Sequence, residues 1–580
     1  MGKKKEKYVT EKVSLRQCLR IFQGVDMPWG MMAAALILTV VGAFAGLRVA
    51  TFSGDMVDAS GDLPTAELVK FVLATVIQVA LSTAALVIQG LASEKINRGL
   101  RKKLWSKIIY TKQNVYGKDG GETLVSRVTT DCDFACNFFV NIVSLASLTA
   151  TMIMYLTQLY AVNVSMANYV LIFIPVSILV GGGYTVLRFI VAQKVQAMLA
   201  ESTAYLVERT KDMPLIKTAN AQHMEEEEGK KRFLEQYKIQ VKVGWVTALQ
   251  QAIDQFLSIL AIAIPFVVGA GFVSSGILTV GAVVTFNGLF GNVKTSFSNL
   301  ILTAGNLKEA NGALARVTKV FDLEQEYPDA GENLSAEESK DVVLEDITFG
   351  YSSDRTILKE FSCRIPRGKV TAVVGTNGSG KTTMFRLIER LYEPQAGKIC
   401  FGEKEISNYS LHSWRKKFCM IGQGSPMMEG TIRENICYGY DREISEEELV
   451  EVAKLSHVYD FVKDLPEGFD SYVAPGGGNF SGGQKQCIAI ARAMVNPGEY
   501  LLLDEVTSNL DVKREKQVME AMTELMKGRT TVIIAHSLAA IRNADYVLVL
   551  HDGVLESADE PKRILEQTGN YLTKMMERGN

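Results

Sequence analysis

The stretch Lys369–Leu391, KVTAVVGTNGSGKTTMFRLIERL, decides which fold the second half of the chain can adopt. Its β-branched start, Val370–Val374, predicts a buried strand that leads through a glycine-rich loop into an amphipathic helix. Glycines let backbone N–H groups approach phosphate oxygens closely, and the N-terminus of the following helix adds a positive partial charge. The pattern G-x-x-x-x-G-K-T in this context therefore predicts the nucleotide-binding loop of an α/β P-loop domain.

The residues of this loop have expected roles when ATP binds. The Lys381 side chain is expected to reach the β- and γ-phosphates, and the Thr382 hydroxyl is expected to be a ligand of Mg²⁺. Further contacts with the nucleotide are expected from Gly375, Asn377, Gly378, Ser379, Gly380 and Thr383.

Two later strands end in residues that would complete this chemistry. The apolar run in EYLLLDEV, Glu499–Val506, predicts a buried strand ending at Asp504, where a second Mg²⁺ ligand is expected. Glu505 follows directly and is a candidate general base that polarises the attacking water. The stretch TTVIIAH ends at His536, which is a candidate to contact the γ-phosphate or to orient the water.

A second glycine-rich element, NFSGGQKQ, occupies Asn479–Gln486. Ser481, Gly482 and Gly483 precede a helix-like run that includes Gln484, so the element predicts another anion site at a helix N-terminus. A single nucleotide needs only one phosphate-binding loop. The second element therefore raises the question of which ATP molecule it contacts.

Long apolar runs occupy the chain before about residue 310, and six of them reach the roughly 20 residues that a membrane-spanning helix needs. The six candidates are residues 28–50, 67–92, 138–162, 167–188, 246–273 and 279–305. The connections after the first, third and fifth candidates carry no Lys or Arg, whereas the other flanks are basic. Because basic loops stay in the cytosol, the pattern predicts six crossings with both ends of this half cytosolic.

Ionisable residues inside membrane spans are functional candidates because they are costly there. Asp254 lies in the fifth candidate span and Lys294 in the sixth, and their depths differ by only about 6 Å at 1.5 Å per residue. The two side chains could form a structural ion pair or line a cavity that accepts substrate. The sequence leaves both possibilities open.

Composition excludes several classes of protein. The 580 residues carry a formal net charge of −2, which gives no reason to expect a nucleic-acid partner. The eight cysteines show neither a CxxC pair nor metal-like spacing with histidine, as expected for reduced cytosolic thiols. The basic start is followed by mixed polar sequence, so no cleavable secretory signal is expected.

These motifs, in this order, resemble those of an ABC transporter, specifically an exporter half-transporter with its membrane domain fused ahead of one ATPase domain. Tyr351 in ITFGYSSDRTIL matches the adenine-stacking aromatic of the family, and Gln423 in IGQGSPMMEGTIRENI matches its Mg²⁺-linked glutamine. Asp511 in TSNLD matches the dimer-crossing loop, and FSGGQ corresponds to the signature sequence, with Phe480 where leucine is usual. The resemblance implies six transmembrane helices over residues 1–320, a linker over 321–340 and an ATP-binding domain over 341–580.

The resemblance also implies how the second glycine-rich element is used. In this family the signature sequence binds the γ-phosphate of ATP held by the opposite subunit, so two chains are required. Mg²⁺ would be held by Thr382, Gln423 and Asp504, while His536 and Lys381 would stabilise charge on the transferred phosphoryl group. Because Glu505 and His536 are both present, a homodimer is expected rather than a heterodimer with one impaired site.

The loop sequences VYGKDGGETLVSRVTTD and ERTKDMPLIKTANAQ resemble the two cytosolic loops whose tips dock on the ATPase domains of exporters. Three departures from the family pattern concern the coupling between the ATPase domain and the membrane domain. The segment VAPGGGNFSGGQ lacks the usual glutamate-containing motif, Cys487 replaces a basic residue, and Ser537 stands where arginine is usual. None of these departures removes a catalytic group.

The resemblance implies ATP-driven export of a hydrophobic, amphipathic or peptide-like substrate. The alternatives are a lipid flippase and a non-transport membrane ATPase that gates or regulates a partner. Few basic residues in the spans argue against a strongly anionic lipid, and intact hydrolytic residues argue against a mere gate. An importer is disfavoured because the membrane and ATPase domains are fused. The expected location is a multi-pass protein of a bacterial plasma membrane, with the ATPase domain and both termini cytoplasmic.

Overall fold

In the computed structural model the chain forms two compact units, and each is described by itself. One unit comprises Met1–Ser106 and Glu122–Asp322, and the other comprises Lys107–Gly121 and Leu323–Asn580. The structure describes residues 15–59, 65–119, 121–171, 175, 195, 198–199, 201–335, 337–352, 354–422, 424–440, 442–504, 512–535 and 538–566.

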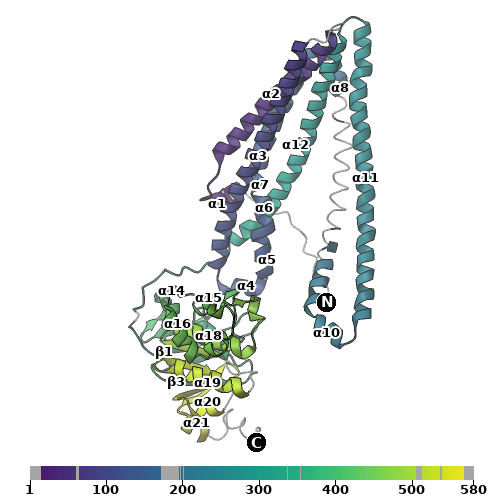
Figure 1. Cartoon of the computed structure of the whole chain (residues 1–580). Coiled ribbons are helices and arrows are strands. Elements are labelled where there is room, and N and C mark those ends of the chain that lie inside the picture. Colours follow the sequence, from purple (N-terminus) through teal and green to yellow (C-terminus); the bar gives the residue numbers. More distant parts are fainter. Residues whose placement is uncertain are drawn as a thin grey trace. The chain divides into compact units, whose positions relative to one another are not determined.

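The N-terminal half of the chain is helical (Figure 1). Its helices are α1 (Leu15–Phe22), α2 (Trp29–Asp58), α3 (Thr65–Ile109), α4 (Gln113–Asp119), α5 (Gly121–Ser126), the π-helix η1 (Arg127–Asp131), α6 (Cys132–Ala135), α7 (Asn137–Val162), α8 (Val164–Leu171), α10 (Met213–Thr218), α11 (Gln222–Ser274) and α12 (Val280–Phe321).

Among the described residues, four helical stretches are long and apolar enough to cross a membrane. They are Trp29–Asp58, Thr65–Ile109, Leu124–Val162 and Gln222–Ser274. They contain the first, second, third and fifth segments predicted from the sequence. The fourth predicted segment, 167–188, falls largely outside the described residues. The sixth, 279–305, lies almost wholly in α12, which is not among the four, so the total of six crossings stays a prediction.

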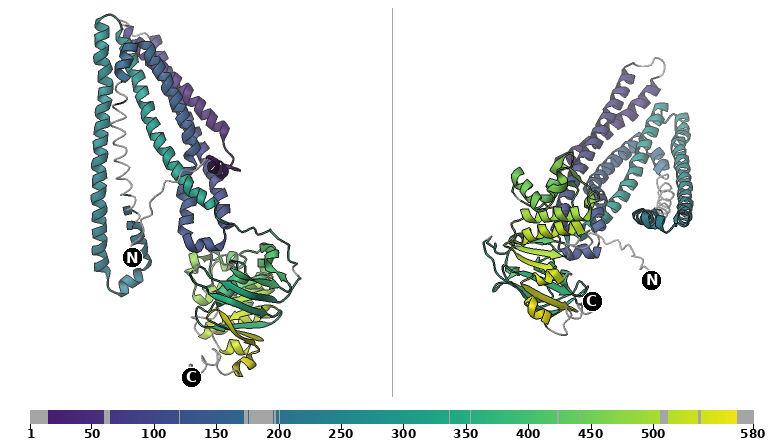
Figure 2. Two further views of the ribbon diagram at one scale, coloured as in Figure 1. Left: turned by 180° about the vertical axis from the view of Figure 1, so that it is seen from behind. Right: turned by 60° about the horizontal axis from the view of Figure 1, so that its bottom comes forward.

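The helical unit is organised around α12, which packs against α7 and α2. The buried side chains at this contact include Phe286, Leu289, Phe290 and Val293 of α12, together with Leu159 of α7. Figure 1 shows α11 separating from α12 with distance from the turn that joins them, and the view from behind in Figure 2 agrees. Close van der Waals packing of these side chains favours the bundle, while α11 keeps a largely exposed face.

Two glycines bring the backbones of α2 and α12 into direct contact. A Cβ atom at Gly281 would lie 2.1 Å from the carbonyl oxygen of Gly54, and a Cβ atom at Gly54 would lie 2.4 Å from that of Gly281. Asp58 closes the same contact: its carboxylate accepts hydrogen bonds from Gly281 N at 2.7 Å and from Thr279 Oγ1 at 2.5 Å. A carboxylate at a helix N-terminus is stabilised by the helix dipole, so Asp58 fixes where α12 begins.

A buried carboxylate lies at the π-helical turn that precedes α6. Asp131 is 4% exposed and accepts hydrogen bonds from Arg316 of α12, at 2.6 and 2.9 Å, and from Arg127, at 2.7 Å. Single π-turns inside helices often mark functional positions. Here the turn ties the segment that follows α5 to the last third of α12.

The C-terminal half is an α/β unit. Its strands are β1 (Val342–Phe349), β2 (Leu358–Ile365), β3 (Val370–Gly375), β4 (Ala396–Phe401), β5 (Lys404–Glu405), β6 (Phe418–Ile421), β7 (Gly430–Thr431), β8 (Tyr472–Val473), β9 (Tyr500–Asp504), β10 (Thr530–Ile534), β11 (Tyr546–His551) and β12 (Val554–Asp559). Its α-helices are α13 (Lys381–Ile388), α14 (Leu411–Lys416), α15 (Ile432–Ile436), α16 (Glu446–Leu455), α17 (Tyr459–Val462), α18 (Gly482–Val495), α19 (Val512–Met526), α20 (Leu538–Arg542) and α21 (Pro561–Glu566). Short 3₁₀ turns are η2 (Ile406–Asn408), η3 (Gly468–Asp470) and η4 (Pro475–Gly477).

A six-stranded sheet with the order β12-β11-β3-β10-β9-β6 forms the middle of this unit. Strands β11, β3, β10, β9 and β6 are parallel, and β12 is antiparallel at one edge. Alternate residues of β9 face opposite sides: Tyr500 and Leu502 contribute to a core shared with α13 and the sheet β2-β1-β4-β5, whereas Leu501 and Leu503 contribute to a core shared with α18 and α19. Burial on both sides explains why β9 reads as a continuous apolar run.

The segment 107–121 belongs to the α/β unit although it precedes most of the helical unit in sequence. Its backbone pairs with the segment after α12: Lys112 N donates to Glu324 O at 3.1 Å, and Glu326 N donates to Tyr110 O at 2.7 Å. Lys112 Nζ also lies 3.3 Å from Glu393 Oε1. The first part of the segment predicted as a linker, at Glu324 and Glu326, therefore pairs with the segment 107–121.

The contact between Gly54 and Gly281 generates a prediction about stability. The substitution Gly281→Ala should force α2 and α12 apart, because the new methyl group meets backbone atoms that cannot rotate away. We expect the free energy of unfolding to fall by about 1–3 kcal/mol, as for other overpacked contacts. Thermal unfolding of the protein in lipid nanodiscs would measure the change.

The matched control is Gly291→Ala on the same helix, where a Cβ atom would meet no heavy atom within 4 Å. Alanine favours helix over glycine by about 1 kcal/mol, so this variant should be neutral or more stable. Equal unfolding temperatures for the two variants would contradict the close contact.

Candidate functional site

The loop between β3 and α13 has a backbone conformation that requires glycine. Gly378 and Gly380 adopt φ angles of 86° and 104°, which residues with side chains rarely adopt. A Cβ atom at Gly380 would lie 2.5 Å from Leu358 Cδ2, and one at Gly375 would lie 2.2 Å from the carbonyl oxygen of Leu550. One side of the loop therefore packs closely against Leu358 and Leu550, whereas its tip, at Asn377 and Gly378, is exposed.

Two buried polar side chains in this loop fit a phosphate group. Lys381 is 7% exposed, and its Nζ donates to the carbonyl oxygens of Gly375 and Thr376, each at 3.0 Å. Ser379 is 1% exposed, and its Oγ has no hydrogen-bond partner among the described residues. Buried hydroxyl groups are normally hydrogen-bonded, and ammonium groups bind phosphate strongly. The two side chains thus supply a donor and a cation where the sequence predicts phosphate.

The structure brings together two of the residues predicted to bind Mg²⁺. Thr382 Oγ1, on the first turn of α13, donates to Asp504 Oδ2 at 3.0 Å. Asp504 is 5% exposed and ends β9. Hydroxyl and carboxylate oxygens are the ligands that Mg²⁺ prefers, and this ion keeps several waters when it binds nucleotide phosphates. The oxygen atoms of this pair therefore fit the chemistry of a magnesium site.

Strand order explains how residues far apart in sequence meet at this edge. Strand β10 lies between β3 and β9, with Ile534 opposite both Val373 and Asp504. The carboxyl ends of parallel strands share one edge of the sheet, and ligands bind there in open α/β sheets. The predicted residues Gln423, Glu505, Asp511 and His536 follow strands of this sheet in sequence but lie outside the described residues.

The predicted adenine-binding aromatic contacts the phosphate-loop helix. Tyr351 is 38% exposed, and its hydroxyl hydrogen-bonds with Thr383 Oγ1 at 3.2 Å. Arg386 Nη1 donates to the same hydroxyl at 2.9 Å, and its guanidinium carbon lies 5.6 Å from the ring centroid. The Tyr392 ring packs edge-on to the Tyr351 ring at 5.1 Å. Arg386 was not predicted from the sequence, because its contact with Tyr351 depends on how α13 packs against the segment that follows β1.

The second glycine-rich element forms the N-terminus of α18. Ser481 is the N-cap, and its Oγ accepts a hydrogen bond from Gln484 N at 3.3 Å while Gln484 Oε1 accepts one from Ser481 N at 2.9 Å. Ser481 and Gly482 are exposed, whereas Gly483 is buried. Phe480 is half-buried and packs near Phe461 at 6.1 Å, which holds the loop on the unit.

The two ionisable residues predicted inside the membrane spans lie on α11 and α12. Lys294 Nζ of α12 donates to Ser258 Oγ of α11, so this side chain joins the two helices. Asp254 lies on α11 one turn before Ser258, and its side chain is outside the described set. Contact with substrate at either position stays a prediction.

Comparisons with known proteins agree with this geometry. The family model for the ABC transporter transmembrane region matches residues 32–296, and the ABC transporter model matches residues 358–508. A "Multidrug resistance ABC transporter ATP-binding and permease protein" of Lactococcus lactis subsp. lactis (strain IL1403) is 27% identical over 575 residues, covering 97% of this chain and 96% of that protein. An "ATP-dependent lipid A-core flippase" of Syntrophus aciditrophicus (strain SB) is 29% identical over 521 residues, covering 87% and 85%.

The fold also matches a solved structure described as a bacterial Atm1-family ABC exporter with ATP bound. The TM-score is 0.79 at 24% identity, with 95% of this chain and 98% of that chain covered. Together with the two family models, this match confirms the predicted fold class, a helical transmembrane region followed by an α/β nucleotide-binding domain.

Glu389, at the C-terminal end of α13, has an unusual protonation equilibrium. Burial raises the pKa of its carboxyl from 4.5 to about 7, although Arg415 and Arg386 oppose the shift. The folded protein therefore binds more protons than the unfolded chain between about pH 4.5 and 7, and its stability falls as pH rises through this window.

The substitution Glu389→Gln should remove this dependence. At pH 8 the variant should be more stable than the wild type by up to about 3 kcal/mol, from 1.36 kcal/mol per pKa unit, and at pH 4.5 the two should be alike. Unfolding temperatures of the nanodisc-embedded protein at the two pH values would test this. Glu403→Gln, at an exposed position, is the control and should leave the pH dependence intact. An unchanged pH dependence in Glu389→Gln would contradict the assignment.

Proposed function

The chain belongs to the ABC transporter family with the architecture of an exporter half-transporter, and we propose that two copies of it form the working transporter. It is an ATPase that couples ATP hydrolysis to export across a membrane. The observation that carries the ATPase assignment is the hydrogen bond between Thr382 and Asp504, because it joins two predicted ATP-site residues at one edge of the sheet, and the buried Lys381 directly precedes Thr382 in sequence.

Each nucleotide would be bound first by the phosphate loop of one chain. Backbone N–H groups around Gly378 and Gly380 and the Lys381 ammonium group would hold the phosphates, with the adenine against Tyr351. Glu505 would polarise the attacking water, and His536 with Lys381 would stabilise charge on the transferred phosphoryl group.

Mg²⁺ fits the oxygen atoms of Thr382 and Asp504, with Gln423 as the third expected ligand. When bound, the ion neutralises charge on the phosphate oxygens. The contribution of the chain is to hold two oxygen ligands in place on rigid elements, α13 and β9.

The second copy would supply the signature sequence. Within one chain, the N-cap Ser481 and the first residue of α18, Gly482, are exposed. The positive end of the helix dipole is therefore directed at solvent. Such a site is suited to the γ-phosphate of an ATP molecule bound by another subunit. A dimer would therefore contain two ATP sites, with Ser481, Gly482, Gly483 and Gln484 of one chain facing the loop of the other. Asp511 would lie where the two chains cross.

The substrate would be a hydrophobic, amphipathic or peptide-like molecule. A relative that this chain matches over nearly its whole length carries a name that refers to multidrug resistance, which supports an amphipathic substrate. Lipid translocation is the second candidate, because another relative is named as a lipid A-core flippase. The protein would lie in a bacterial plasma membrane, with its ATPase domain in the cytoplasm.

The role of Glu505 yields a direct prediction. Glu505→Gln should lower steady-state ATP hydrolysis by about 10²–10⁴-fold, the range for loss of a general base, while ATP binding persists. Phosphate release from protein in nanodiscs, together with nucleotide retention on the purified protein, would measure both quantities.

Glu515→Gln is the matched control, since this glutamate is exposed on α19 and has no proposed role in catalysis. It should hydrolyse ATP at the wild-type rate. Persisting hydrolysis in Glu505→Gln would assign the general base to another residue.

A further inference from the structure

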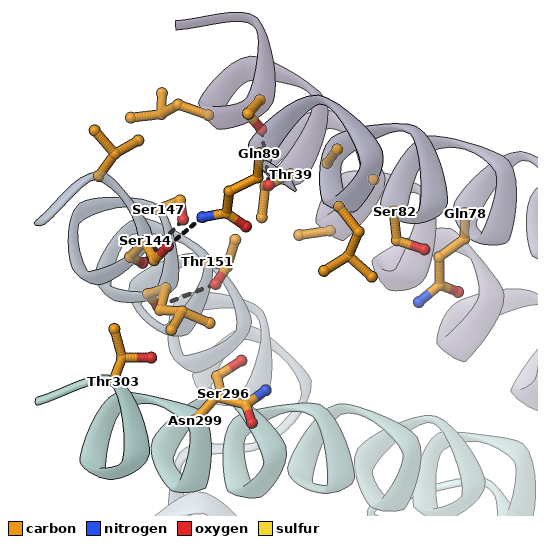
Figure 3. A pocket seen from close by; sticks show the side chains of 18 of the residues that line it. Thr39, Gln78, Ser82, Gln89, Ser144, Ser147, Thr151, Ser296, Asn299 and Thr303 are labelled. Atoms are coloured by element: carbon orange, nitrogen blue, oxygen red, sulfur yellow. Dashed lines mark hydrogen bonds between the residues drawn. The ribbon is translucent and has the colours of Figure 1, made fainter. Parts of the chain in front are cut away.

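A pocket of about 360 Å³ lies among the helices of the helical unit (Figure 3). Four helices line it: α2, α3, α7 and α12. On each of three helices the polar lining residues recur at helical spacing, as in Gln78, Ser82 and Gln89 of α3. Ser144, Ser147 and Thr151 of α7 and Ser296, Asn299 and Thr303 of α12 follow the same rule. The polar stripes therefore face one common space, as the labelled side chains in Figure 3 show.

The lining carries polar groups but no formal charge. Eleven of the nineteen described lining residues have a hydroxyl or amide side chain, and none of the nineteen is Asp, Glu, Lys, Arg or His. Lys294 of α12 is not among them and hydrogen-bonds with Ser258 instead. A charged ligand entering this pocket would lose water without meeting an opposite charge, which is unfavourable in a membrane interior.

Most hydroxyl groups around the pocket already donate their proton to a backbone carbonyl oxygen of the protein. Thr39 Oγ1 donates to Ala35 O at 2.8 Å, and Ser144 Oγ donates to Val140 O at 2.9 Å. Ser82, Ser147 and Thr151 donate in the same way to carbonyl oxygens of their own helices, at 3.1, 2.9 and 3.0 Å. A hydroxyl that donates to its own helix keeps lone pairs that can accept. The walls therefore present mainly hydrogen-bond acceptors.

Two side-chain amides face the same space from opposite sides. Gln78 of α3 and Asn299 of α12 have no hydrogen-bond partner within the part of the chain that the structure describes. Gln89, by contrast, donates to Ser144 Oγ (Figure 3). Gln78 is half-buried and Asn299 is exposed, so both amide groups are accessible and can donate and accept hydrogen bonds with a ligand. The rest of the lining is aliphatic, including Leu36, Leu86 and Leu148.

We propose that this pocket binds the exported substrate and selects an uncharged amphipathic molecule that carries hydroxyl or amide hydrogen-bond donors. This inference rests on the proposed function, because it names the substrate class of the same transporter. The donors of the ligand bind the hydroxyl oxygens of α2 and α7, while Gln78 and Asn299 hold its polar groups. Its apolar part packs on the leucines. Charged relatives of the same molecule are excluded by the cost of leaving water without a counter-ion.

Three probes with the same body and different charge test the selection. They are a hexyl glucoside (neutral), a hexyl glucuronide (anionic) and a hexyl glucosaminide (cationic), each with a diazirine on the alkyl chain. Each is used with the full-length protein in nanodiscs, at concentrations that leave the discs intact. Photo-crosslinking without ATP, followed by mass spectrometry of the labelled peptides, measures binding. ATP hydrolysis in the presence of each probe is measured separately.

The neutral probe should label peptides of α3, α7 and α12 at concentrations at least tenfold lower than either charged probe. Gln78→Leu with Asn299→Leu should weaken this labelling at least tenfold. Asn299→Asp should shift the preference to the cationic probe, and Gln78→Glu should do the same from the opposite wall. Gln251→Leu, an exposed position on α11 outside the pocket, should change nothing.

Stronger labelling by a charged probe in the wild type would overturn the proposal. So would an unchanged order of probes in both acidic variants, which a merely structural role of the two amides would produce. If the wild type fails to hydrolyse ATP under any condition, the proposed function fails. The crosslinking result still decides the pocket chemistry, because it requires no ATP turnover.

Discussion

The hydrogen bond between Thr382 and Asp504 is the contact on which the nucleotide site depends. It joins the first turn of α13 to the end of β9, two elements separated in sequence but held at one edge of a parallel sheet. Parallel strands bring their carboxyl ends to the same edge of the sheet, so the phosphate loop and the two residues predicted to bind Mg²⁺ meet there. The glycines of the loop then permit the close approach that phosphate requires.

Much of this site could be predicted from the sequence because its residues are tied to local patterns. The strand, loop and helix around Lys381 form one contiguous motif, and a buried strand that ends at Asp504 reads as an unbroken apolar run. The contribution of Arg386 to the Tyr351 site depends on how two separate elements pack, which periodicity does not encode. The same holds for segment 107–121, which joins the α/β unit through backbone pairing with residues 324–326.

The membrane half shows the same division between local and tertiary information. Hydropathy predicted six spans, of which four correspond to described helices that could cross a membrane, and it drew attention to Asp254 and Lys294 as residues that contact the substrate or pair with each other. The pocket is instead lined by hydroxyl and amide side chains that are individually unremarkable in a helix. Only the arrangement of α2, α3, α7 and α12 around one pocket brings them together. A search for polar residues at helical spacing within each span would have found the stripes on α3 and α7.

The central claim is that each ATP site is completed by two chains, and mixed dimers test it most directly. One chain carries Lys381→Ala and the other Ser481→Arg, with different tags so that mixed dimers can be purified. If the sites form between chains, the mixed dimer retains one intact site and traps one nucleotide per dimer with vanadate, whereas either variant alone traps none. Failure of the mixed dimer to trap nucleotide, with wild-type dimers trapping it normally, would contradict the account.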